Sequence, residues 1–168
     1  VTLDELRHIF GAVADDPKVV EGLPALNAAM LRAGISTPAR KAAFLATLRS
    51  ESGFRYDAVE VGNASRFRGR GFIQITGEAN YRSAGDFLGL DLLENPDLAI
   101  NGLASPAIAA WYWTVARNIN VSADALERRC MPGHLTGSAF VVDHAGERTL
   151  LLLHAKLGRW LQPGGHAD

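Results

Sequence analysis

A short run punctuated by two glycines, FRGRGFIQIT at residues 67–76, is the feature that most constrains how this chain can fold. Gly69 and Gly71 allow backbone conformations that other residues avoid, and they let a neighbouring segment approach closely. Arg70, which lies between them, is suited to pair with a carboxylate and hold it in place. We expect Gln74 and Thr76 to point to one side of a strand, where neutral donors and acceptors suit the recognition of sugars. The alternative is an ordinary exposed strand with a surface arginine.

A well-marked helix precedes this run and ends at an acidic residue. Thr37 is a favoured N-cap and Pro38 a favoured first helical residue, and the apolar spacing that follows predicts a helix over residues 39–50. Gly53 ends it, so Glu51 lies in the last turn, where the helix dipole disfavours a second negative charge. Partial burial against nearby aromatic side chains would add a desolvation cost. Both effects favour the protonated carboxyl that a general acid needs.

A second acidic residue, Glu60, follows Glu51 by nine positions, in a segment that reads as loop or short strand. A loop carboxylate exposed to water stays ionised and suits a general base. One carboxyl that donates a proton, beside another that activates a water, is the pair that cleaves glycosidic bonds. The alternative is two surface glutamates next to a polar loop.

Three motifs carry a resemblance to a known family. They are FLATLRSESG at residues 44–53, RGRGFIQITGEANY at 68–81 and NPDLAINGLASPAIAAWYW at 95–113. In this order they resemble the family 19 glycoside hydrolases, which include chitinases and the chitinase-like endolysins of bacteriophages. The likeness spans roughly residues 3–129. It implies a mainly α (α+β) fold, a lysozyme-like helical domain with a short β segment, and an inverting mechanism.

The resemblance also implies a role for individual residues. Glu51 matches the general acid of the family, and Glu60 matches the general base of its short-loop, endolysin-like members. The positions that match substrate-binding residues, including those that line the sugar cleft and hold the water, are Arg70, Gln74, Thr76, Asn80 and Tyr81. For Asn80 and Tyr81 the alternative is plain packing on a helix.

Further helices are expected along the first two thirds of the chain. Their predicted ranges are residues 3–13, 19–33, 78–88 and 105–117. Thr2 and Glu5 form a capping-box pattern at the first of them. The last contains the WYW run at residues 111–113, which we interpret mainly as core rather than as a platform for sugars.

The sequence changes character near residue 130, where Pro132-Gly133 breaks the chain. Residues 135–142 and 148–154 are rich in β-forming side chains and flank a predicted turn at 143–147, which indicates a C-terminal β-hairpin tail. Residues 133–166 resemble the start of a Nudix hydrolase, but the metal-binding glutamates of that family would follow Gly165 and are not in the chain.

The two resemblances together predict two domains. Residues 1–130 form a family 19-like domain, and residues 131–168 form a Nudix-like fragment. A natural fusion, a frameshift or an artificial chimera would each give such a junction. The closing segment that usually follows the Trp-rich helix in family 19 proteins is not found here.

Composition excludes several classes of protein. The net charge is −1 and the pI about 6.6, so no strong field attracts nucleic acid or anionic membranes. No apolar run approaches the roughly 20 residues of a membrane span. Cys130 is a single cysteine, so it forms no intramolecular disulfide or thiolate metal cluster, and the five histidines lack metal-ligand spacing. We expect no metal and no cofactor.

The expected partner is a polysaccharide, either peptidoglycan or chitin, and the short Glu51–Glu60 spacing and lack of disulfides favour the endolysin-like side. The protein is expected to be a monomer, with association through the tail as an alternative. No signal peptide is recognised, which predicts a cytoplasmic protein that reaches the cell wall on release or leaves by another route. The competing functions are a sugar-binding or structural remnant of the fold and a fragment of a Nudix pyrophosphatase.

Overall fold

The computed structural model describes residues 1–124, 136–138, 150–154, 158–161 and 164–166. The chain forms two compact units, Val1–Asn120 and Val121–Asp168. The predicted boundary near residue 130 falls outside the described residues.

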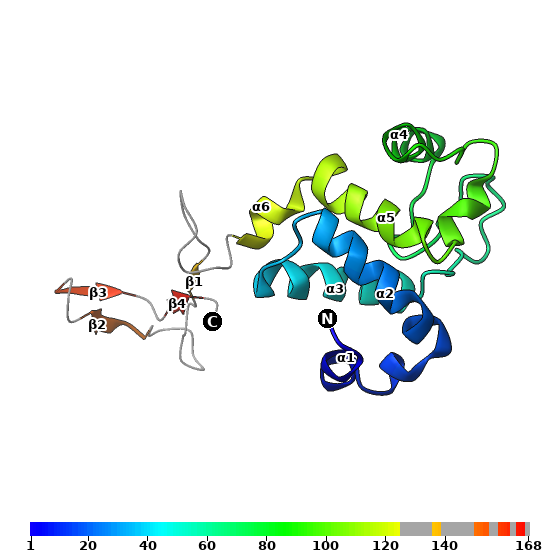
Figure 1. Ribbon diagram of the computed structural model, residues 1–168. Coiled ribbons are helices and arrows are strands. Elements are labelled where there is room, and N and C mark those ends of the chain that lie inside the picture. Colours follow the sequence, from blue (N-terminus) through cyan, green and yellow to red (C-terminus); the bar gives the residue numbers. More distant parts are fainter. Residues whose placement is uncertain (125–135, 139–149, 155–157, 162–163, 167–168) are drawn as a thin grey trace. The chain divides into compact units, whose positions relative to one another are not determined.

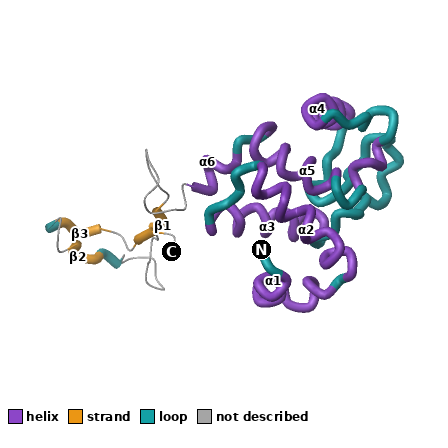
Figure 2. Tube along the Cα trace, in the orientation of Figure 1, coloured by secondary structure: helices purple, strands orange, loops and turns teal. Residues whose placement is uncertain are grey.

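The first unit is mainly helical, and this confirms the expected mainly α fold with little strand (Figure 1). Its elements are α1 (Leu3–Phe10), η1 (Gly11–Asp15), α2 (Pro17–Arg32), α3 (Pro38–Ser52), α4 (Glu78–Leu88), η2 (Pro96–Ile100), α5 (Ala104–Trp111) and η3 (Tyr112–Ala116), with α6 (Ile119–Asp124) at the junction with the second unit. The long non-helical segments before and after α4 gather at one end of the unit, drawn in teal in Figure 2. No helix in the described part of the chain is both long and apolar enough to cross a membrane.

Local signals in the sequence set most of the helix ends. The Thr37 side chain accepts from the backbone N of Arg40 at 3.2 Å, and Gly53 closes α3 with φ +64°. Thr2 and Glu5 form the predicted capping box of α1. The first helix is shorter than expected, because Gly11 takes φ +60° and turns the chain into a 3₁₀ segment.

The core of this unit lies between α2, α3 and α5. Leu26 of α2 and Phe44 of α3 have no exposed surface, and the Phe44 ring meets Trp113 edge-on at 5.3 Å between centroids. Trp111 and Trp113 are buried, so the WYW run contributes to the core as interpreted. Phe44, Leu45 and Leu48 of α3 are buried in this core, which anchors the helix that bears Glu51 in its last turn.

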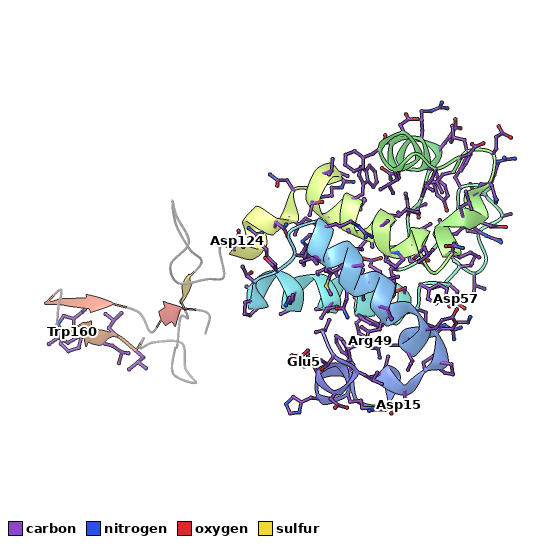
Figure 3. The ribbon with its side chains drawn as sticks, viewed as in Figure 1. Glu5, Asp15, Arg49, Asp57, Asp124 and Trp160 are labelled. Carbon is purple, nitrogen blue, oxygen red and sulfur yellow. The ribbon has the colours of Figure 1, made fainter. Side chains whose placement is uncertain are left out.

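The second unit is described in four short strands: β1 (Thr136–Ser138), β2 (Leu152–His154), β3 (Arg159–Leu161) and β4 (Gly164–His166). β1 pairs antiparallel with β4, and β2 pairs antiparallel with β3, with Leu153 opposite Trp160. Trp160 is exposed (Figure 3). Where they are described, residues 136–138 and 152–154 thus pair with β4 and β3 and not, as expected, with each other. The predicted turn at 143–147 lies outside the described residues.

Candidate active site

Glu51 lies in the last turn of α3, and its side chain is exposed. Among the described residues it has no hydrogen bond or ion pair with another side chain. The expected partial burial is therefore wrong, and the reason is the direction of the aromatic rings. Phe44, Phe54 and Tyr56 turn into the core, with at most 5% of each exposed.

The helix end itself is firmly anchored. Phe54 follows the cap residue Gly53 with φ +69°, a left-handed conformation that is uncommon for a bulky residue. This turn sends its ring into the core, where it contacts Phe10 and Phe72 at centroid distances of 5.5 and 5.7 Å. The backbone beneath Glu51 is thus fixed while the carboxylate stays in solvent.

The chain segment between the two acidic residues is held in place at its centre by hydrogen bonds and packing. Arg55 donates to both oxygens of Asp57 at 3.0 and 3.1 Å, which holds the pKa of that carboxyl below its usual range (Asp57 is labelled in Figure 3). Tyr56 is 5% exposed and accepts from Lys18 Nζ at 3.0 Å. Its ring lies on Gly22 of α2, where a Cβ would approach to 2.8 Å.

Glu60 is half-buried and firmly held. Its Oε2 accepts from the backbone N of Gly69 at 2.8 Å and from Asn63 Nδ2 at 2.9 Å. The hydrogen bond from Gly69, then that from Asn63, lowers the pKa of Glu60, and the positive charge of Arg68 acts in the same direction. Glu60 is therefore ionised at neutral pH, as expected of a base, but through donors in the protein rather than through free exposure to water.

Both glycines of the run permit the close approach that the sequence predicted. A Cβ on Gly69 would lie 2.8 Å from Gln74 Oε1 and 3.3 Å from Glu60 Oε2, so these two side chains flank the same glycine. Gly71 has φ +74°, and a Cβ there would lie 2.3 Å from the carbonyl oxygen of Ala99. The run thus brings Gln74 next to Glu60.

Gln74 and Thr76 do not lie on a strand as expected. Residues 71–74 form a turn, because Gly71 and Gln74 both take positive φ, and only isolated bridges connect Arg70 to Val59 and Ile75 in this segment. Gln74 Nε2 donates to the carbonyl oxygens of Gly71 at 2.9 Å and Ala58 at 3.2 Å. A non-glycine residue with φ +50° that is held in this way is typical of a functional site.

Thr76 and Asn80 extend this polar surface from Gln74 to the start of α4. Thr76 is exposed and donates from Oγ1 to the carbonyl oxygen of Gln74 at 2.8 Å. Asn80 is half-buried and donates from Nδ2 to the carbonyl oxygen of Thr76 at 2.8 Å. Hydrogen bonds thus connect Asn80 to Thr76 and Thr76 to Gln74, while Gln74 and Glu60 both lie against Gly69.

Arg70 and Tyr81, by contrast, lie beneath the surface. Tyr81 has no exposed area and Arg70 is 7% exposed, so the structure gives them a supporting place rather than one that lines a cleft. Arg70 Nε donates to Asp97 at 2.9 Å, which is the carboxylate pairing expected of it, and another of its nitrogens donates to the Tyr81 hydroxyl at 3.2 Å. The hydroxyl in turn donates to the carbonyl oxygen of Arg68 at 2.8 Å. Burial raises the pKa of Tyr81, which keeps this proton in place.

Sequence reasoning missed Asn63 and Ser105. Ser105 is buried, and its hydroxyl accepts from the backbone N of Phe72 at 2.9 Å. Nothing local in the sequence marks that long-range contact. Asn63 accepts from the backbone N of Ser65 at 2.9 Å, the turn that an Asn-x-Ser sequence favours, and this signal was available.

Two other kinds of feature, metal-binding clusters and hollows, can be assessed in the described residues. No group of His, Cys, Asp or Glu among them is arranged to hold a metal ion. A hollow of about 410 Å³ lies between α2, α4 and α5, lined by alanines and by Phe87, Trp111 and Val115. None of the predicted site residues lines it.

Comparison with known proteins gives a consistent picture. The family model for class I chitinases, glycoside hydrolase family 19, matches residues 47–145, more than half of the chain. An endochitinase of Avena sativa is 33% identical over 127 residues, which are 70% of this chain and 64% of that protein. An acidic 27 kDa endochitinase of Solanum lycopersicum is 40% identical over 88 residues, 50% of this chain and 36% of that protein.

A bacterial protein is similar over a shorter stretch. The glycosyl hydrolase family 19 domain-containing protein of Haemophilus influenzae is 37% identical over 81 residues, 41% of this chain and 40% of that protein. The chain thus spans less than two thirds of the length of these curated relatives.

Proposed function

The chain belongs to the class I chitinase family, glycoside hydrolase family 19, and from that premise we propose that it hydrolyses β-1,4-linked polymers of N-acetylhexosamine. Chitin is the first substrate to test, because the relatives described above include endochitinases. Peptidoglycan contains the same type of linkage, and the nine-residue spacing of Glu51 and Glu60 favours it as the second substrate.

The contrast between the two carboxyl groups is the observation that carries this proposal. Glu60 is ionised and accepts hydrogen bonds from the backbone N of Gly69 and from Asn63, and a general base requires this ionised form. Glu51 is exposed at a fixed helix end, and within the described residues no hydrogen bond or ion pair occupies its carboxyl group. The group is therefore accessible to the leaving oxygen of a bound substrate.

In the proposed reaction, Glu51 donates its proton to the glycosidic oxygen while Glu60 takes a proton from the attacking water. The water adds to the anomeric carbon from the face opposite the leaving group, so the configuration inverts. An inverting pair of this type holds its carboxyls roughly 6.5–9.5 Å apart to admit the water. Gln74, Thr76 and Asn80 supply neutral polar groups beside Glu60 for the sugar and the water.

The direct experiment measures chain cleavage of soluble chitin oligomers and of purified peptidoglycan by the intact protein. Shorter oligomers or soluble muropeptides that appear with the protein, and not with the Glu60→Gln variant, support the proposal and identify the polymer. Binding to either polymer without cleavage would instead favour the sugar-binding remnant.

A further inference from the structure

The loop after Glu60 carries a side chain that the proposed reaction does not itself involve, Asn63. Its amide forms two hydrogen bonds in different directions. Oδ1 accepts from the backbone N of Ser65 at 2.9 Å, and Nδ2 donates to Glu60 Oε2 at 2.9 Å. Because a backbone N–H requires an acceptor, Ser65 fixes which end of the amide faces Glu60. Asn63 therefore presents a donor to the carboxylate.

Both donors that contact Glu60 bind the same oxygen. The backbone N of Gly69 also donates to Oε2, at 2.8 Å, and the described part of the chain places no hydrogen-bond donor on Oε1. Two donors on one carboxylate oxygen limit rotation of the group. The other oxygen, Oε1, is left to receive a proton.

We propose that Asn63 is a positioning residue for Glu60, which holds the carboxylate so that Oε1 receives the proton of the attacking water. The assigned reaction rests on the proposed function, whereas the contact between Asn63 and Glu60 does not. Of the two donors, Gly69 acts through its backbone, so Asn63 is the one that a side-chain substitution removes. Arg68 is the charged group, among those described, whose field acts on Glu60.

The most selective test is Asn63→Asp, which has nearly the same shape. One oxygen of the new carboxylate still accepts from the backbone N of Ser65, so the turn is preserved. The other faces Glu60 Oε2 with like charge where a donor stood, and this disfavours the ionised form of Glu60. We expect the acidic limb of the kcat/KM profile to move up by about one pH unit.

A neighbouring substitution provides the matched control. The Ser65 hydroxyl accepts from the backbone N of Phe67 at 3.3 Å and does not contact Glu60. Ser65→Ala therefore perturbs the same loop while it leaves the donor on Glu60 in place. We expect its acidic limb to coincide with that of the unmodified protein.

A measurement independent of turnover separates this inference from the proposed function. NMR titration of the Glu60 side-chain carboxyl carbon in the intact protein is expected to give a higher midpoint in Asn63→Asp and an unchanged midpoint in Ser65→Ala. Should Asn63→Asp fail to fold, Asn63→Ala is expected to move the midpoint in the same direction by less. Identical midpoints in the unmodified protein and the folded Asn63 variants would overturn the positioning role. A shifted midpoint in a protein that cleaves neither polymer would support the contact and reject the proposed function alone.

Discussion

The two acidic residues of the proposed site are held in opposite ways. Around Glu60, backbone and side-chain donors converge on one carboxylate oxygen, and the glycine at position 69 leaves room for the side chain of Gln74. At Glu51 it is the backbone that is held in place, because Phe54 anchors the end of α3 in the core. The carboxylate itself extends into solvent. An ionised base gains from donors that hold it, whereas an acid must meet a leaving group that arrives with the substrate. The difference in surroundings therefore matches the difference in proposed role.

The largest effect is expected from Glu51→Gln, which keeps the shape of the side chain but removes its transferable proton. Turnover should fall by roughly 10²–10⁴-fold, the usual contribution of general acid–base catalysis, while the melting temperature stays unchanged. Glu78→Gln on the exposed face of α4 is the matched control, and its turnover should be normal. Near-normal turnover in Glu51→Gln would remove Glu51 from the mechanism.

The support beneath the Glu60 loop can be broken at Arg70. Arg70→Met removes the donors to the exposed carboxylate of Asp97, to the carbonyl oxygen of Arg66 and to the buried hydroxyl of Tyr81. Because several hydrogen bonds of one buried guanidinium are lost together, we expect the free energy of unfolding to fall by about 2 kcal/mol. Arg82→Met, which breaks the exposed Arg82–Glu78 pair, should cost only about 0.3–0.5 kcal/mol. Denaturant unfolding of both variants measures the difference, and equal losses would show that Arg70 has no special supporting role.

The close approach at position 69 can be tested with a single methyl group. In Gly69→Ala the new Cβ would meet Gln74 Oε1 at 2.8 Å and the Glu60 side chain at 3.2 Å, so both must move. We expect a loss of about 1–3 kcal/mol in stability, together with reduced turnover. Gly62→Ala is a useful comparison in the same loop, because its Cβ meets nothing within 4 Å and only the positive φ of +81° is strained. If Gly62→Ala reduced turnover as much as Gly69→Ala, contact with Glu60 and Gln74 would not be the cause.

The smallest effect concerns pH and stability. The pKa of Glu60 is lower in the folded protein than its usual value, so its stabilising contribution is present above the unfolded value, about 4.3. That contribution is lost as the pH falls through the folded pKa. The melting temperature of the unmodified protein should therefore exceed that of Glu60→Gln near neutral pH, and the difference should shrink in acid. A difference that does not vary with pH would contradict this assignment.

The sequence alone predicts the parts of the structure that local chemistry determines. The predicted helix at residues 78–88 coincides with α4, and the cap residues Thr37 and Gly53 bound α3 as expected. These ends depend on neighbours a few positions away. Glu51 and Glu60 were also identified as candidates, from spacing and family resemblance.

The predictions that the structure contradicts concern contacts between residues that are distant in the sequence. The prediction that Glu51 is partly buried is wrong because the direction of the Phe44 and Phe54 rings depends on how α3 packs in the core. The expected strand at Gln74 is a turn because Gly71 takes positive φ to fit against Ala99. Tyr81 was expected to line the sugar cleft, but it is buried, and its hydroxyl joins a hydrogen-bond network with Arg70 and the carbonyl oxygen of Arg68. Such contacts leave no periodic signal in the sequence.

The central claim is that Glu51 and Glu60 act as an inverting acid–base pair, and the anomeric form of the first product tests it most directly. Hydrolysis of a soluble chitin oligomer can be followed by proton NMR before the product equilibrates between its two anomers. Because the cleaved bond is β, inversion predicts that the new reducing end appears first as the α anomer. A β anomer as the first product would show retention and would contradict the account.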